Sequence, residues 1–109
     1  TGTSGEDWAK ENLPNATIVS VDDVAAAMAG VQTGLYDAMV IDLPVASNLI
    51  STSYSDLTIA KEIPTGEQYG IAVSKDNPAL TEAINKVLAD MEKDGTMASL
   101  KSKWFGSNI

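Results

Sequence analysis

The sequence predicts an α/β fold in which a mostly parallel sheet is flanked by helices. The run Ala38–Asp42, four apolar residues followed by a carboxylate, is typical of a strand covered on both faces. Apolar and β-branched runs alternate with helical patterns over residues 16–60, an order that implies right-handed β-α-β crossovers. Residues 78–94 carry apolar side chains at the spacing of an amphipathic helix.

Caps and apolar runs define the elements of the first part of the chain. Thr3 or Ser4 is a favourable N-cap for the first helix, and Ser20 with Asp23 resembles a capping box for the second. Pro44 suits the first turn of the third. In chain order we expect a helix over 5–13, a strand over 16–21, a helix over 22–33, a strand over 38–42, a helix over 44–51 and a short strand over 57–60.

The composition changes at residues 63–66, Ile-Pro-Thr-Gly, which we interpret as a connector. Alternating apolar residues then predict a strand over 68–74. Asn77 and Pro78 begin the helix over 78–94 in the preferred way, and Gly95 ends it. A shorter helix is expected over 96–104, with Met97, Leu100 and Trp104 on its apolar side.

Composition excludes several function classes. The 109 residues suit one small domain, and an apolar content of 44% allows a core. The chain has no cysteine and no histidine, so we expect no disulfide, no thiol catalysis and no Cys-ligated zinc. Its 15 acidic residues would suit calcium, but they show no EF-hand spacing, and we expect no metal and no cofactor. The net charge of −8 and the absence of arginine argue against nucleic acid as a partner. The chain does not begin with methionine and shows no signal peptide, which suggests a processed product or a piece of a longer chain.

Two features could bind opposite charges. Asp42 ends the central strand, and ligands of open α/β sheets lie outside the carboxyl ends of the strands, so Asp42 could hold an ammonium group or a cation. The alternative is that Asp42 only caps the helix begun by Pro44. The turn Thr3–Gly5 could present backbone N–H groups to an anion, or it could be an ordinary capped turn. If both features face one crevice, they match a zwitterion.

Four stretches resemble the family 3 extracellular solute-binding proteins, the polar amino-acid receptors of ABC importers. These stretches are Thr1–Glu6, Gly34–Ala46, Gln68–Val73 and Asp94–Gly106. The resemblance implies a type II periplasmic-binding-protein-like receptor that closes over its ligand, with this chain covering about the second half. It implies a second lobe without its first strand over 1–66, a crossing strand over 67–75 and, over 76–109, helices that pack on or beside the first lobe.

The same resemblance implies the ligand contacts. Thr3 and Ser4, with Gly2 and Gly5 nearby, would bind the α-carboxylate of a free polar amino acid, and Asp42 would bind its α-ammonium group. The arginine that usually clamps the carboxylate would belong to the missing first lobe. The implied location is the periplasm or the extracellular surface, with lipid anchoring through an absent N-terminal region as one option.

The implied partners are the amino acid, the missing first lobe and an ABC permease. The sheet would carry an unpaired gap, which predicts a domain-swapped or strand-paired oligomer as a further option. Two other functions stay open. A prephenate-type dehydratase of the same fold would need another acid in the crevice, and no residue marks one. A ligand-sensing or docking module without transport is the other.

Overall fold

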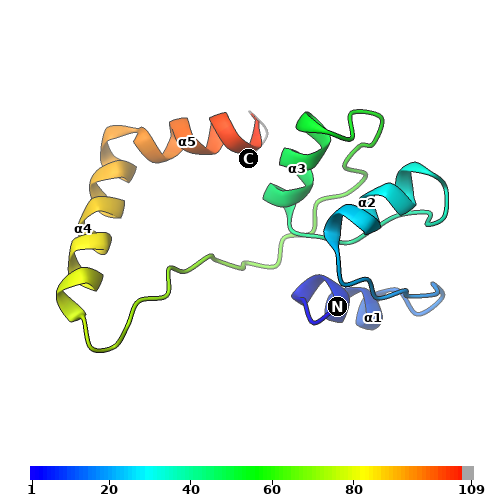
Figure 1. Ribbon diagram of the computed structural model, residues 1–109, viewed down its shortest axis with the longest axis horizontal. Helices are drawn as coiled ribbons and strands as arrows, with labels where there is room; N and C mark the ends of the chain where they lie inside the picture. The colour runs from blue at the N-terminus through cyan, green and yellow to red at the C-terminus, as the bar shows by residue number, and fades with distance from the viewer. Residues whose placement is uncertain (107–109) are drawn as a thin grey trace. The chain divides into compact units, whose positions relative to one another are not determined.

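The structure, a computed structural model, describes residues 1–106 (Figure 1). The chain divides into two compact units, Thr1–Ala60 and Lys61–Ile109. The first unit contains helices α1 (Ser4–Asn12), α2 (Val24–Gln32) and α3 (Leu43–Thr52), and the second contains α4 (Pro78–Asp94) and α5 (Thr96–Phe105). Residues 107–109, the end of the predicted 76–109 region, lie outside the described residues.

The helices of the first unit begin at residues that favour capping. Thr3 caps α1, and its Oγ1 accepts the Glu6 N–H with an N···O distance of 3.3 Å. Asp23 caps α2, and its Oδ1 accepts the Ala25 N–H at 3.0 Å. The predicted capping box of Ser20 with Asp23 is therefore wrong. Asp23 occupies the N-cap position itself, and the Ser20 hydroxyl is donated to the Glu6 carboxylate instead.

The amphipathic helix of the second unit is confirmed over the predicted residues. Asn77 is its N-cap, and Asn77 Oδ1 accepts the Leu80 N–H at 3.1 Å. The helix ends at Gly95, which has a φ of 83° and also precedes α5. The two helices contact each other, and they meet at a corner at this glycine (Figure 1).

The predicted parallel sheet is not confirmed. Residues 16–21, 38–42, 57–60 and 68–74 contain no strand among the described residues, and Figure 1 draws these segments as coil. A strand is held by hydrogen bonds to a neighbouring strand and by burial of its side chains. Among the bonds that residues 1–106 make with one another, no backbone hydrogen bond joins any two of these segments. Apolar side chains within them stay in contact with solvent, with Val19 55% exposed and Ile71 63% exposed.

The buried apolar core of the described residues is small. It consists of Ala9, which is 5% exposed, and Met28, which is 2% exposed, both in the first unit. Ala9 lies in α1 and Met28 in α2. No residue of α4 or α5 is buried, although both helices carry large apolar side chains.

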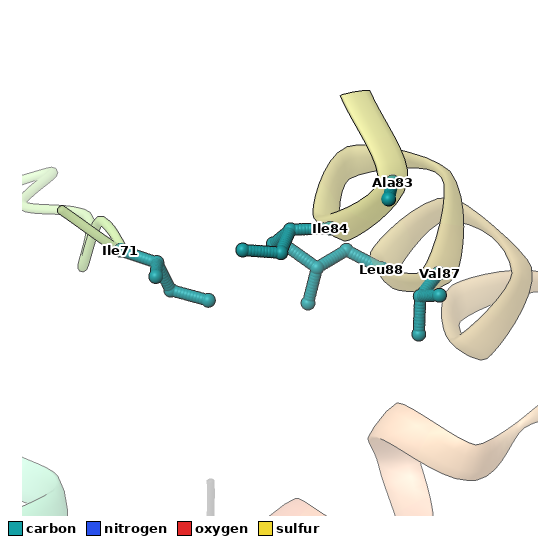
Figure 2. A pocket seen from close by; sticks show the side chains of 5 residues that line it. All are labelled: Ile71, Ala83, Ile84, Val87 and Leu88. Carbon is teal, nitrogen blue, oxygen red and sulfur yellow. The ribbon is translucent and has the colours of Figure 1, made fainter. Parts of the chain in front are cut away.

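The second unit has an apolar hollow of about 330 Å³ between α4 and the segment that precedes it (Figure 2). It is lined by Ile71, Ala83, Ile84, Val87 and Leu88. Small-molecule sites normally combine an apolar wall with a few polar groups that orient the ligand. All five lining side chains are hydrocarbon, so we interpret the hollow as an uncovered helix face. No helix within residues 1–106 has both the length and the apolar composition needed to cross a bilayer.

Candidate functional site

The first turn of α1 lies directly against the segment that precedes α3. A Cβ atom added at Gly5 would lie 3.3 Å from the Val40 carbonyl oxygen and 3.5 Å from Val40 Cγ1. Contacts at 3.3 Å are tighter than a side chain normally accepts, so the absence of a side chain at Gly5 allows this approach. Val40 precedes Asp42 by two residues. The structure therefore brings the turn Thr3–Gly5 and the end of the segment 38–42 into one neighbourhood.

The residues of the turn are largely exposed. Gly2, Thr3 and Ser4 are exposed, and Gly5 is half-buried. Ser4 and Gly5 are the first two residues of α1, where backbone N–H groups have no acceptor within the helix. Unlike those two N–H groups, the Gly2 N–H already has an acceptor, Glu6 Oε2, at a distance of 2.5 Å. Ser4 and Gly5 are thus the residues of the turn whose N–H groups are best placed to meet an anion.

Asp42 is the half-buried N-cap residue of α3, with Pro44 in the first turn. A capping carboxylate accepts an N–H from the second or third residue of the helix. The Asp42 side chain makes no such hydrogen bond. Asp42 therefore occupies the N-cap position, as the interpretation of Asp42 as only a helix cap requires. It does not make the side-chain hydrogen bond through which a capping residue stabilises a helix.

Glu6 connects this region, a role that no pattern in the sequence predicts. Its carboxylate accepts the Gly2 N–H at 2.5 Å, the Lys10 Nζ at 2.6 Å and the Ser20 hydroxyl. The side chain is 12% exposed. Hydrogen bonds from Lys10, Ser20 and the Gly2 N–H lower the pKa of Glu6 to about 2. The i,i+4 spacing of Glu6 and Lys10 predicts their ion pair from the sequence. The sequence gives no comparable signal for the bond between Glu6 and Ser20, because the two residues are far apart along the chain.

The lowered pKa of Glu6 predicts a loss of stability in acid. The Glu6 carboxyl binds its proton less tightly in the folded state than in the unfolded state, where the pKa of glutamate is about 4.3. Ionised Glu6 therefore contributes to the free energy of unfolding above that pH. This contribution is lost as the pH falls toward the folded-state pKa of about 2. We expect Glu6→Gln to flatten the fall in the free energy of unfolding between about pH 5 and pH 2. Urea titrations across this range measure it.

Glu11→Gln is the matched control for this prediction, because Glu11 is an exposed glutamate of the same helix. It should leave the pH dependence close to that of the unsubstituted protein. An equal effect of the two substitutions would contradict a specific role for the bonds from Lys10, Ser20 and Gly2.

Comparison with known proteins identifies the family to which the chain belongs. Residues 6–107 match the bacterial extracellular solute-binding proteins, family 3. The chain belongs to this family, as the resemblance of its four stretches predicts. The family implies a type II periplasmic-binding fold, and its description is that of binding proteins and not of enzymes.

Three curated relatives show the range of ligands in their names. The L-cystine-binding protein TcyJ of Escherichia coli K12 is 31% identical, over 99% of this chain and 41% of the relative. The ABC transporter arginine-binding protein 1 of the same organism is 32% identical, over 95% of this chain and 44% of that relative. The ABC transporter glutamine-binding protein GlnH of Bacillus subtilis is 28% identical, over 94% of this chain and 37% of that relative. The chain spans about two-fifths of the length of these relatives. No solved structure matches it significantly.

Proposed function

We propose that this chain is part of a receptor that binds a free polar amino acid and passes it to an ABC permease. Membership of the solute-binding family supports this proposal. So do the names of the relatives, which describe proteins that bind cystine, arginine and glutamine. The family description also supports a periplasmic or extracellular location.

The close approach of Gly5 to Val40 is the observation that carries the proposal. It brings the N-terminus of α1, with its partial positive charge, close to the segment that ends in the carboxylate of Asp42. An α-amino acid carries a carboxylate and an ammonium group on the same carbon. In the proposed complex, the ligand carboxylate accepts the N–H groups of Ser4 and Gly5, beside Gly2 and Thr3, and the ammonium group lies at Asp42.

The proposal also assigns the parts of the chain. Residues 1–66 form most of a second lobe, 67–75 a crossing segment, and 76–109 helices that pack on or beside the first lobe. The uncovered apolar face of α4 supports this packing, because Val87 is 55% exposed and Leu80 45% exposed. The segments 16–21 and 38–42 would pair as strands once the remainder of a type II fold is present. A swapped or strand-paired oligomer and a lipid anchor are finer parts of the same proposal.

A thermal-shift assay on the intact protein tests the proposed function. Each standard amino acid and L-cystine is compared with a carboxylic acid that has the same side chain but no amine. We expect the bound amino acid to stabilise the folded state by about 2.7 kcal/mol at a concentration of 100 times its Kd, with a much smaller effect from its deaminated partner. Equal stabilisation by both compounds would refute the pairing of carboxylate and ammonium subsites.

A further inference from the structure

We propose that Glu6 is a positioning residue for the α-carboxylate subsite, where it fixes the backbone of the turn that precedes and begins α1. This inference rests on the proposed function. In the proposed complex Glu6 does not touch the ligand. It acts through Gly2, whose N–H it accepts, and through Ser20, which ties the turn to the segment following α1.

The hydrogen bonds of Glu6 reach both sides of the turn. Gly2 has a φ of +70°, a conformation that glycine adopts readily but that nothing within its own residue enforces. The Glu6 carboxylate accepts the Gly2 N–H from four residues further along the chain. Thr3, which lies between them, returns a bond by accepting the Glu6 N–H. The loop of chain from Gly2 to Glu6 is therefore closed by two hydrogen bonds, with Ser4 and Gly5 inside it.

Because Glu6 is charged, the direction in which its substitution changes ligand affinity distinguishes an electrostatic role from a positioning role. An anion in the first turn of α1 should repel a ligand carboxylate, although Lys10 offsets part of that charge with an Nζ···Oε1 distance of 2.6 Å. Removing the charge alone should therefore leave ligand affinity unchanged or raise it. Removing a group that positions the turn should lower affinity, because the turn must then be ordered when the ligand binds. The two explanations predict opposite results for the same substitution.

Asp7 offers a matched control for this comparison. It lies next to Glu6 in the first turn of α1, is exposed, and removes one negative charge when replaced by alanine. Isothermal titration calorimetry of the intact protein against each standard amino acid and L-cystine measures affinity. We expect Glu6→Ala to weaken binding about tenfold, and Asp7→Ala to leave it unchanged or tighten it. Glu6→Gln keeps an oxygen that can accept the Gly2 N–H and should recover part of the loss.

Any other result overturns either the positioning role of Glu6 or the proposed function. If Glu6→Ala binds as tightly as the unsubstituted protein, or if Asp7→Ala weakens binding equally, Glu6 does not position the turn and the proposed function is unaffected. If the unsubstituted protein binds no compound, the proposed function fails, and this inference with it. Should Glu6→Ala not fold, as judged by circular dichroism, Ser20→Ala removes one tether without changing the charge. It should weaken binding about threefold, and unchanged affinity would overturn the proposal.

Discussion

Asp42→Asn is expected to remove the preference of the intact protein for amino acids over the matching carboxylic acids. A hydrogen bond between two charged groups contributes more than one between neutral groups, and its loss should weaken amino-acid binding about 10- to 100-fold. The deaminated acid has no ammonium group, so its weaker affinity should not fall. Asparagine has almost the same size as aspartate and is an equally favourable N-cap, so α3 should still begin at Leu43.

Calorimetric titrations with both compounds measure the ratio of their affinities, which is the quantity that this prediction concerns. Asp37→Asn is the matched control, because it makes the same chemical change at an exposed residue of the loop that follows α2. It should leave the ratio unchanged. An unaltered ratio in Asp42→Asn, together with a lower free energy of unfolding, would instead favour a purely structural role for Asp42 at the start of α3.

The helices could be predicted from the sequence because their signals are local. Thr3 and Asn77 each cap a helix through an N–H only three residues away. Pro78 and Gly95 mark the two ends of α4 in the same local manner. Each of these interactions forms whether or not the rest of a larger fold is present. The positions of the five helices found in residues 1–106 consequently agree with the residue patterns to within a few residues.

The sheet could not be predicted in the same way, since a strand depends on a neighbour that can lie anywhere in the fold. The apolar run Ala38–Asp42 indicates burial on both faces, yet Val40 is 38% exposed here. The pattern records the environment for which the segment is suited, and the described residues do not supply that environment. Membership of the solute-binding family gives a reason for the mismatch, because the matched relatives are more than twice as long as this chain.

The sequence predicts which residue types belong to the candidate site, but not which of these residues lie close together or hydrogen-bond to one another. Asp42 and the turn Thr3–Gly5 could be selected because carboxylates and helix N-termini have known charge preferences. Their proximity depends on the approach of Gly5 to Val40, which no spacing along the sequence reveals. The Glu6–Ser20 bond spans 14 residues, and the nearby Asp23 favoured a capping role for Ser20 instead. Local patterns therefore select candidate groups, and only the fold shows which of these groups lie close together.

Gly30→Ala is expected to be the most destabilising small substitution in the first unit. A Cβ atom at Gly30 would lie 2.4 Å from both Cδ2 and Cε2 of Tyr36, far inside van der Waals contact. The ring cannot simply move away with its backbone, because the Tyr36 N–H is bonded to the Gly30 carbonyl oxygen at 3.0 Å. Overpacking of this kind costs about 1–3 kcal/mol, against a gain of about 1 kcal/mol that alanine offers within a helix, so we expect a net loss of up to about 2 kcal/mol.

A double-mutant cycle with Tyr36→Ala separates these two effects, and chemical denaturation of the four proteins measures them. In the Tyr36→Ala background the ring is gone, so Gly30→Ala should stabilise α2 by up to about 1 kcal/mol through its higher helix propensity. The coupling energy between the two sites should therefore be large, because the residues are in contact. If Gly30→Ala destabilises both backgrounds equally, the Tyr36 ring is not the cause. The buried Gly30 backbone would then have to be constrained by another part of the first unit.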